Sequence, residues 1–409
     1  MQIIVCNIGS TSFKFRLLEM PAEEERARGR IERVGSPQAA IAYWVEGRQV
    51  VECTAPLASH RDAVQHSLTF LTAPPHGVLA GLGQIDGVGF KTVQAGELNG
   101  SVLLTEAVLK AMEEYADLAP AHNPPYLTAI YMFRELLPST ALVGVFEPGF
   151  HTSAPEYARV YGTPYEWFAQ YGVRRYGYHG ASHRFVAQEV RKTLNLPSNR
   201  HRIISCHLGG SSSLCAIRDG VSIDTSMGFT PQSGLIQGTR IGDMDPFVLP
   251  YIMKKKGITL EQALLECTKN AGLKGLSGVS EDMRDIKAAI ARGDKRALLA
   301  RQKFIYDVKR YIGAYLVLLE GVDAIAFAGG IGQSDAELRA EVLASLAFLG
   351  MRIDQTRNER NEPIISAPDS AIAALVIHTN EEIVVARETM RVIQEQQHRP
   401  DGKSQTQGV

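Results

Sequence analysis

The stretch NIGSTSFKF, residues 7–15, places a glycine and three hydroxyl residues between two apolar segments. The residues after the turn alternate between apolar and basic side chains, so we expect a strand, a tight turn and a second strand. Backbone N–H groups in a glycine turn form a concavity that binds anions, and hydroxyls add donors without bulk or charge. Ser10, Ser12 and Lys14 share a parity and can point toward one anion. We therefore favour a phosphate-binding hairpin over an ordinary turn.

A similar stretch opens the second half of the chain. The sequence HLGGSS at residues 207–212 repeats the pattern of residues 7–12: a polar residue, an apolar one, glycine, a small residue, a hydroxyl and serine. Each copy follows an apolar strand pattern and precedes another. One such match could arise by chance, but two matches, one in each half, indicate a duplicated α/β unit that carries the same loop in both copies.

A third glycine-rich stretch, AGGIGQS at residues 328–334, lies between a buried strand pattern and a helical one. It lacks the G-x-G-x-x-G spacing, so a dinucleotide-binding reading is weak. The chain also has no Walker A pattern and no D-F-G motif of protein kinases. Any nucleotide must therefore be held by a different device.

Two further segments contain candidate site residues. His179 and His183 stand four residues apart in RRYGYHGASH, but no acidic residue lies between them, so zinc binding by this pair is improbable. Arg240 lies in the long glycine-rich segment 228–245. A solvated arginine is the simplest reading, but an arginine in such a turn before a helix is also what a phosphate clamp uses.

The bulk composition limits the class of protein. The chain has 409 residues, with 43 Lys plus Arg against 44 Asp plus Glu, a balance that gives no reason to expect nucleic acid or an anionic membrane as partner. No signal peptide or membrane-spanning segment is evident. The five cysteines are scattered, and Cys6 and Cys206 lie in apolar strand patterns where reduced core packing is expected. We predict a soluble cytoplasmic protein.

The patterning predicts two α/β domains that meet near residues 148–151. The first is residues 1–148, completed by a C-terminal helix at about 381–397, and the second is residues 151–380. The polar tail, residues 398–409, is predicted to be disordered. Within these domains we predict a charge-rich surface segment at 21–33, a helix capped by Ser59, and a long amphipathic helix at about 294–320.

Seven stretches together resemble the acetate kinase family, carboxylate kinases of the actin, heat-shock ATPase and sugar-kinase superfamily. They occur in the family's order: NIGSTSFK, LAPAHNPP (118–125), RRYGYHGASH, HLGGSSS, DTSMGFTPQSGLIQGTR (224–240), AGGIGQS and TNEEIVVARET (379–389). The resemblance implies a two-domain actin-like ATPase fold of the ribonuclease H-like type. In this fold, duplicated mixed β-sheet units are flanked by helices, with an interdomain cleft. It also implies a homodimer that forms through the second domain.

The implied reaction is reversible transfer of the ATP γ-phosphoryl group to a short-chain carboxylate, acetate by default, directly and in line. The products are an acyl phosphate and ADP, and Mg²⁺ or Mn²⁺ is required. Such a transfer needs positioning and positive charge more than covalent help. By resemblance, His179 and Arg240 hold the transferring phosphoryl group, Asn7 and Glu381 bind the metal, and His122 lies near the phosphoryl path. The implied ATP-binding residues are Ser10, Ser12, Lys14, His207, Gly209, Gly210, Ser211, Ser212, Gly329, Gly330, Ile331 and Gly332.

Several positions depart from the family's pattern. Lys91 replaces an arginine and Glu147 an aspartate, both at the implied catalytic site, and Gly210 stands where the second loop usually has asparagine. The implied acyl pocket is Val93, Ala121, Tyr178 and Pro231, of which Ala121 and Tyr178 replace leucine and phenylalanine. These departures leave open a kinase for propionate or another larger acid, a pyrophosphate-dependent enzyme, and a degenerate nucleotide-binding protein that no longer catalyses.

Overall fold

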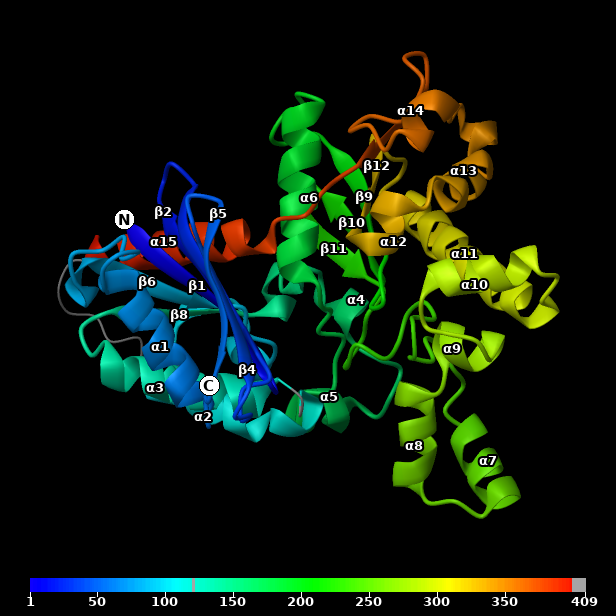
Figure 1. Ribbon diagram of the computed structural model, residues 1–409. Helices are drawn as coiled ribbons and strands as arrows, with labels where there is room; N and C mark the ends of the chain where they lie inside the picture. Colours follow the sequence, from blue (N-terminus) through cyan, green and yellow to red (C-terminus); the bar gives the residue numbers. More distant parts are fainter. Residues whose placement is uncertain (120–121, 399–409) are drawn as a thin grey trace. The chain divides into compact units, whose positions relative to one another are not determined.

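The computed structural model describes residues 1–119 and 122–398 (Figure 1). The chain divides into two compact units. The first joins Met1–Gly149 to the segment that starts at Glu381, and the second is Phe150–Asn380. Each unit is an α/β structure in which helices pack on a mixed β-sheet.

The sheet of the first unit contains β1 Gln2–Gly9, β2 Ser12–Glu19, β3 Glu24–Glu32, β4 Ala39–Val45, β5 Arg48–Ala55, β6 Ile85–Phe90, β7 Ser101–Leu103 and β8 Ala141–Val145. The strand order is β5-β4-β3-β2-β1-β6-β8-β7. β1 to β5 pair antiparallel in sequence, whereas β1, β6 and β8 run parallel. The carboxyl ends of these parallel strands meet at one edge of the sheet, the usual place for a ligand in an open α/β sheet.

The helices of the first unit are α1 His60–Thr72, α2 Glu106–Glu114, α3 Asn123–Leu136 and α15 Glu381–Gln397. α1 and α3 pack on one face of the sheet, and α15 lies across β1, β6 and β8 on the other (Figure 1). The alternation of β1 supplies both cores, because Ile4 and the fully buried Cys6 face α1 and α3 while Ile3 and Val5 face α15. Ser59 caps α1 as predicted.

The second unit repeats this arrangement with β9 Arg202–His207, β10 Ser213–Arg218, β11 Val221–Thr225, β12 Ala324–Ala328 and β13 Ala373–Val376. The strand order is β11-β10-β9-β12-β13. β9, β10 and β11 are antiparallel, and β9, β12 and β13 are parallel. The same order and directions hold for β3-β2-β1-β6-β8 of the first unit. The predicted duplication of a mixed-sheet unit is therefore confirmed.

The helices of the second unit are α4 Glu156–Arg159, α5 Tyr165–Tyr171, α6 Gly180–Thr193, α7 Val248–Lys256, α8 Leu260–Lys269, α9 Gly272–Ser277, α10 Met283–Ala291, α11 Lys295–Leu318, α12 Gly329–Ser334, α13 Ala336–Ala344 and α14 Gln355–Glu359. α6 and α11 pack on opposite faces of the sheet. Ser205 of β9 is hydrogen-bonded to His183 of α6, whereas Ile204 and the fully buried Cys206 join the core beneath α11. α11 confirms the predicted long helix.

Some expectations need correction or lie beyond what the structure describes. The segment predicted as a charged surface stretch, residues 21–33, contains β3. Of the tail predicted to be disordered, only His398 is described, and its Nδ1 is 2.7 Å from the carbonyl oxygen of Gln394. Within residues 1–119 and 122–398, no helix combines the length and apolarity needed to cross a bilayer.

Candidate active site

The serine hairpin of the first unit has the predicted form. β1 pairs with β2 up to Gly9 opposite Ser12, which leaves Ser10 in the exposed turn. Lys14 is directly opposite Asn7, so both project from the same face, and both side chains are exposed. His60, the first residue of α1, donates from Nε2 to the Gly9 carbonyl oxygen at 2.9 Å and so ties the turn to the helix.

A charged cluster forms where the parallel strands of the first unit end. Lys91 directly follows β6, Glu147 opens a 3-10 turn two residues after β8, and Glu381 is the first residue of α15. The Lys91 Nζ lies 3.0 Å from the Glu147 Oε1 and forms a second ion pair with Glu381. Thus three predicted site residues that are far apart in sequence form one ion-pair cluster.

The environment of this cluster keeps its lysine charged. Burial alone lowers the pKa of Lys91, but the charges of Glu147 and Glu381 outweigh it, so the pKa of Lys91 is raised. Glu147 is only 7% exposed, which strengthens the ion pair relative to one in water. Lys91 therefore remains a cation between two carboxylates across the physiological pH range.

Tyr126 of α3 contacts the hairpin and was missed by the sequence analysis. Its hydroxyl accepts from the Ile8 backbone N–H at 3.3 Å and donates to the Asn7 Oδ1 at 3.5 Å. Burial raises the pKa of Tyr126, so the hydroxyl keeps its proton as a donor. We infer that Tyr126 orients the Asn7 amide. Tyr126 directly follows the HNPP stretch, and nothing in the sequence marked it as a site residue.

The other predicted residues of the first unit lie beside these elements or at their ends. Val93 is partly buried two residues beyond Lys91. His122 is exposed at the N-cap of α3. The predicted acyl-pocket residue Ala121 lies outside the described residues.

The second serine loop is held by a glutamine and an arginine. The Ser212 hydroxyl donates to the Gly209 carbonyl oxygen at 2.9 Å and accepts from the Gly209 N–H at 3.0 Å. The Ser211 hydroxyl accepts from the Arg240 Nη1 at 2.9 Å and donates to the Gln237 Oε1 at 3.0 Å. Arg240 is therefore not a solvated surface arginine.

Gln237 was another residue that the sequence analysis missed. It is fully buried, its Oε1 accepts from the Arg240 Nη1 at 3.1 Å, and its Nε2 donates to the Pro231 carbonyl oxygen at 2.7 Å. A glutamine three residues before the arginine fixes the guanidinium against the loop. By contrast, a Cβ at Gly210 would meet no atom within 4 Å, so this position does not require glycine for lack of space.

The first residues of α12, Gly329 to Gly332, form the glycine turn that follows β12 and lie directly against the serine loop. The backbone N–H groups of Ile331 and Gly332 donate to the Leu208 carbonyl oxygen at 2.9 and 3.0 Å. Gly329 has a φ of +75°, and a Cβ there would approach the Leu208 carbonyl oxygen to 2.5 Å. Glycine is therefore required at this position for both reasons. Gly330 is open, with no atom within 4 Å of an added Cβ.

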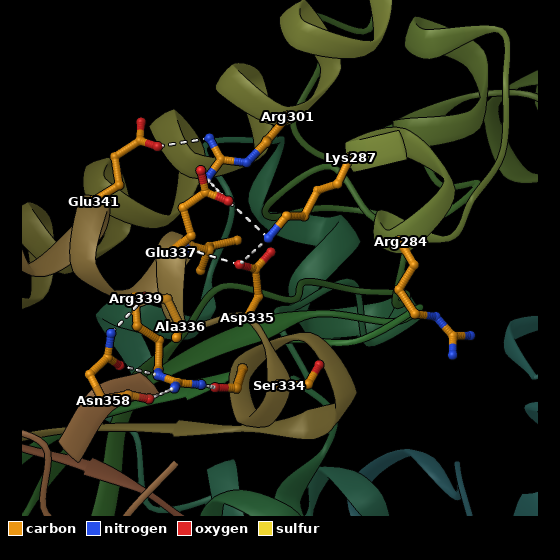
Figure 2. Close-up of polar contacts among 12 residues, drawn as sticks. Arg284, Lys287, Arg301, Ser334, Asp335, Ala336, Glu337, Arg339, Glu341 and Asn358 are labelled. Atoms are coloured by element: carbon orange, nitrogen blue, oxygen red, sulfur yellow. Dashed lines mark hydrogen bonds and ion pairs between the residues drawn. The ribbon is translucent and has the colours of Figure 1, made fainter. Parts of the chain in front are cut away.

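Arg339 of α13 holds the end of this turn, as Figure 2 shows. It is fully buried, and its Nη1 donates to the carbonyl oxygens of Gly332 and Gln333, both at 2.8 Å. Its Nε donates to the Asn358 Oδ1 at 2.8 Å. Burial lowers the pKa of Arg339 to about 10, which still leaves a cation at neutral pH. The contact with Asn358, 19 residues further along the chain, had no local signal in the sequence.

A cavity of about 700 Å³ adjoins both loops of the second unit, a size that suits a drug- or nucleoside-sized ligand. Gly209, Gly210, Gly330 and Ile331 line one side, and Asp282, Arg284 and Lys287 are among the residues on the other. Figure 2 shows Lys287 between Asp335 and Glu337. Its Nζ lies 3.2 Å from the Asp335 Oδ1 and 2.8 Å from the Glu337 Oε2. The polar side chains contributed by residues 280–287 were not predicted.

His179 is held by a buried series of hydrogen bonds. Its Nδ1 is 2.8 Å from the Ser213 Oγ, which is 2.8 Å from the His183 Nε2, and the His183 Nδ1 is 2.8 Å from the Ser205 Oγ. We call this series, His179–Ser213–His183–Ser205, the histidine relay. His179 caps α6 in the left-handed conformation, with φ +58°, and its ring stacks on His207 at 4.2 Å between centroids.

The histidine relay couples the proton positions of its two histidines. Burial, assisted by the charges of His151 and His207, lowers the pKa of His183 well below 6.5, so His183 is neutral and has one N–H and one acceptor nitrogen. If its Nε2 accepts from Ser213, that hydroxyl cannot also donate to His179, and the His179 Nδ1 must be the donor. With the opposite tautomer of His183, the Ser213 oxygen accepts from the His183 Nε2, and the Ser213 proton can be donated to the His179 Nδ1. Ser213 therefore transmits the tautomer of one histidine to the other.

The two predicted acyl-pocket residues of the second unit are both placed by the 228–245 loop. Tyr178 is 3% exposed, and its hydroxyl donates to the Phe229 carbonyl oxygen at 2.8 Å. Pro231, two residues further on, is partly buried, and its carbonyl oxygen accepts from Gln237. The extra hydroxyl that distinguishes Tyr178 from phenylalanine therefore already uses its proton within the fold.

The donors present suit a hard divalent cation that is completed by its substrate. Among the described residues, no group of three or more His, Cys, Asp and Glu side chains could hold a metal by itself. Mg²⁺ in nucleotide enzymes is instead bound by one or two carboxylates together with substrate phosphates and water. The exposed amide of Asn7 and the carboxylate of Glu381 are oxygen donors of this kind.

The sequence matches the Acetokinase family over residues 2–387. It is 42% identical to an acetate kinase of Carboxydothermus hydrogenoformans over 96% of this chain and 99% of that protein. It is also 42% identical to a propionate kinase of Citrobacter rodentium, with 96% of each chain covered. The crystal structure of Porphyromonas gingivalis acetate kinase superimposes with a TM-score of 0.88 at 37% identity, covering 96% of this chain and 99% of that one.

The strand order, the paired serine loops and these matches agree. The chain belongs to the acetokinase family. The fold and family expected from the seven stretches are thereby confirmed.

Proposed function

We propose that this protein transfers the γ-phosphoryl group of ATP to a short-chain carboxylate and forms an acyl phosphate and ADP, reversibly. The observation that most supports this is the Arg240 guanidinium, which is fixed against the serine loop by Ser211 and Gln237. A planar cation fixed in this way is suited to the equatorial oxygens of a transferring phosphoryl group. His179, oriented by the histidine relay, adds a second donor from the same unit.

The remaining roles follow from the residues that each unit brings together. The serine loop, with Gly209 to Ser212, binds phosphate oxygens through backbone N–H groups, because the Ser211 and Ser212 hydroxyls already donate to Gln237 and Gly209. The glycine turn at 329–332 and the adjoining cavity accept the adenosine. In the first unit, Ser10, Ser12 and Lys14 contribute further donors.

Asn7 and Glu381 would hold Mg²⁺ or Mn²⁺, which when bound neutralises phosphate charge during the transfer. Lys91 supplies the charge that an arginine provides in relatives, and Glu147 holds that lysine in place. His122 lies at the start of α3 as an additional donor toward the phosphoryl path.

The proposal also concerns which carboxylic acid the protein prefers. Ala121 and Tyr178 change two of the four expected pocket positions, and one of the matched relatives is a propionate kinase. Since the Tyr178 hydroxyl donates to Phe229, it offers no free proton to a polar acid. We therefore expect a larger apolar acid, propionate, to be used as well as or better than acetate.

The test is acyl hydroxamate formation from ATP and a panel of C2 to C4 acids, with Ala121→Leu as the matched pocket variant and Arg240→Gln as the inactive control. We expect the wild type to process propionate at least as well as acetate in kcat/KM. We expect Ala121→Leu to shift the preference toward acetate by about tenfold, because one methylene in such a pocket is worth roughly 1–3 kcal/mol. Activity with pyrophosphate and none with ATP would overturn the proposed donor. ATP binding without any hydroxamate would indicate a protein that no longer catalyses.

The assembly and location also remain proposals. Exposed apolar side chains on or beside α7 and α8 support an interface with a second copy of the chain; they are Phe247, Val248, Tyr251, Leu260, Leu264 and Leu265. We propose a cytoplasmic homodimer that uses this face. Light scattering of the wild type should give twice the chain mass, and Phe247→Ser/Leu265→Ser should give the mass of one chain. A wild-type protein with the mass of a single chain would overturn the dimer.

A further inference from the structure

A groove of about 250 Å³ crosses the face of the first sheet beside the serine hairpin. Four cations line it from two neighbouring strands: Lys14 and Arg16 from β2, and Arg28 and Arg30 from β3. Trp44 of β4, Asn7 of β1 and Glu382 of α15 complete its walls. α15 covers the same face further along the strands, where Ile3 and Leu18 are buried beneath it, and the groove lies at the N-terminal end of that helix, at Glu382.

The strand register places these cations directly against one another. Lys14 pairs with Arg30, and Arg16 pairs with Arg28, on the same face of an antiparallel ladder. Directly opposed residues have Cβ atoms about 4.5–5.5 Å apart, and like charges in such pairs destabilise a sheet. Two successive like-charge pairs are therefore an arrangement that a sheet does not favour for its own stability.

The nearby acids neutralise this charge incompletely. Glu25 lies 3.3 Å from Arg16 and 3.7 Å from Arg28, and Glu32 lies 3.8 Å from Arg30. All three ion pairs are longer than a charge-assisted hydrogen bond of about 2.7–2.9 Å. Among the described residues, Lys14 forms no ion pair. The guanidinium donors of the groove are therefore available to another anion.

Trp44 prepares one of these guanidiniums for a ligand. The Arg28 guanidinium carbon lies 4.7 Å from the centroid of the Trp44 ring, and that of Arg30 lies 5.9 Å away. Stacking on an aromatic face fixes a guanidinium while leaving its N–H edge open to an oxyanion. The groove is also smaller than the roughly 300–1,000 Å³ of sites for drug-sized ligands, which favours a small ion over a whole nucleotide.

We propose that this groove, which shares Lys14 with the serine hairpin, binds a small multivalent oxyanion, either a phosphoanhydride such as tripolyphosphate or a tricarboxylate such as citrate. The ligand would lie between the two like-charge pairs and contact Arg28, Arg30 and Lys14. Since Lys14 also belongs to the serine hairpin, occupancy of the groove raises the KM for Mg·ATP. That kinetic consequence rests on the proposed function, whereas binding itself does not.

The test is calorimetric titration of the full chain with tripolyphosphate, and separately with citrate, at constant ionic strength. Constant ionic strength is needed because salt screens exposed charges. The variant is Arg28→Gln/Arg30→Gln, and the control is Arg26→Gln/Arg48→Gln, which removes two charges from β3 and β5 outside the groove. Arg30→Gln alone, at an exposed position, is the second variant should the double change impair folding.

We expect a wild-type anion site that the double variant weakens at least tenfold and the control leaves within about twofold. The KM for Mg·ATP without the anion should stay unchanged in both. The ion that binds more tightly identifies the chemistry of the natural ligand. Equal binding by wild type and double variant, or no binding of either ion by the wild type, would overturn the groove proposal. The wild type could bind the anion, and the double variant could lose that binding, while the wild type fails to use ATP. That outcome would overturn only the proposed enzyme function.

Discussion

The Lys91 Nζ lies 3.0 Å from the Glu147 Oε1, at the edge of the sheet where β6 and β8 both end. By the resemblance described in the sequence analysis, the lysine replaces an arginine and the glutamate replaces an aspartate. The longer acid reaches toward the more compact cation. We therefore predict that the two departures act as one coupled substitution.

This coupling can be measured with Lys91→Arg, Glu147→Asp and the double variant. We expect Glu147→Asp alone to lower kcat/KM at least tenfold, because the shortened carboxylate withdraws from the lysine, and Lys91→Arg alone to bring no gain. The double variant should recover activity, with a coupling free energy of about 1 kcal/mol or more. Strict additivity, or a large gain from Lys91→Arg alone, would show that the site is merely impaired.

Removal of the Glu381 carboxylate should weaken the use of Mg²⁺. We expect Glu381→Ala to lose more than about tenfold in turnover and to recover part of it at raised Mg²⁺, because an oxygen donor of the metal is missing. Glu395→Ala, an exposed change on the same helix, serves as the control. Metal titrations of Glu381→Ala and wild type that superimpose would remove Glu381 from the metal site.

Ser213 should act on catalysis through His179. We expect Ser213→Ala to reduce kcat at least tenfold, to leave the KM for Mg·ATP within about threefold, and to shift the pH–rate profile, because the tautomer of His179 is no longer set. Ser213→Thr keeps the hydroxyl and should restore much of the rate. Ser153→Ala removes a hydroxyl outside the relay and is the control. A uniform loss of activity with an unchanged pH profile would indicate a structural role only.

The buried His151 should make the fold sensitive to acid. Burial lowers its pKa from 6.5 to about 4, so the unfolded chain takes up a proton at a higher pH than the folded one does. Its contribution to stability is intact above pH 6.5 and is lost as the pH falls toward 4, by about 1.5 kcal/mol between pH 6.5 and 5. Denaturant unfolding of His151→Gln should show a shallower pH dependence than wild type, while His398→Gln, at an exposed position, should not. Parallel curves for wild type and His151→Gln would contradict this assignment.

Much of the fold could be read from local pattern. The serine hairpins, the long helix α11 and the glycine turn after β12 each show a clear periodic pattern of apolar residues, bounded by glycine or hydroxyl residues. β3 was missed because its buried positions include Ala27 and Gly29, which give a weak apolar signal between charges. Gly29 is small because the rings of Phe15 and Tyr43 occupy the space of its side chain, a fact of the folded sheet.

The site was predictable to the extent that its residues lie in compact motifs. His179 and Arg240 could be singled out in this way, whereas Gln237, Tyr126 and Arg339 could not. Each of these three contacts a segment that folding brings to it: Gln237 contacts the serine loop, Tyr126 contacts Asn7 and Arg339 contacts Asn358. Such long-range partners leave no periodic or spacing signal in a single sequence.

The central claim is transfer of the γ-phosphoryl group of ATP to a carboxylate oxygen. Phosphorus NMR of the reaction with propionate labelled with oxygen-18 in its carboxyl group tests it most directly. The account predicts an acyl phosphate whose phosphorus resonance carries the oxygen-18 isotope shift, with Arg240→Gln forming almost none. Release of inorganic phosphate without labelled acyl phosphate, for acetate as well as propionate, would contradict it.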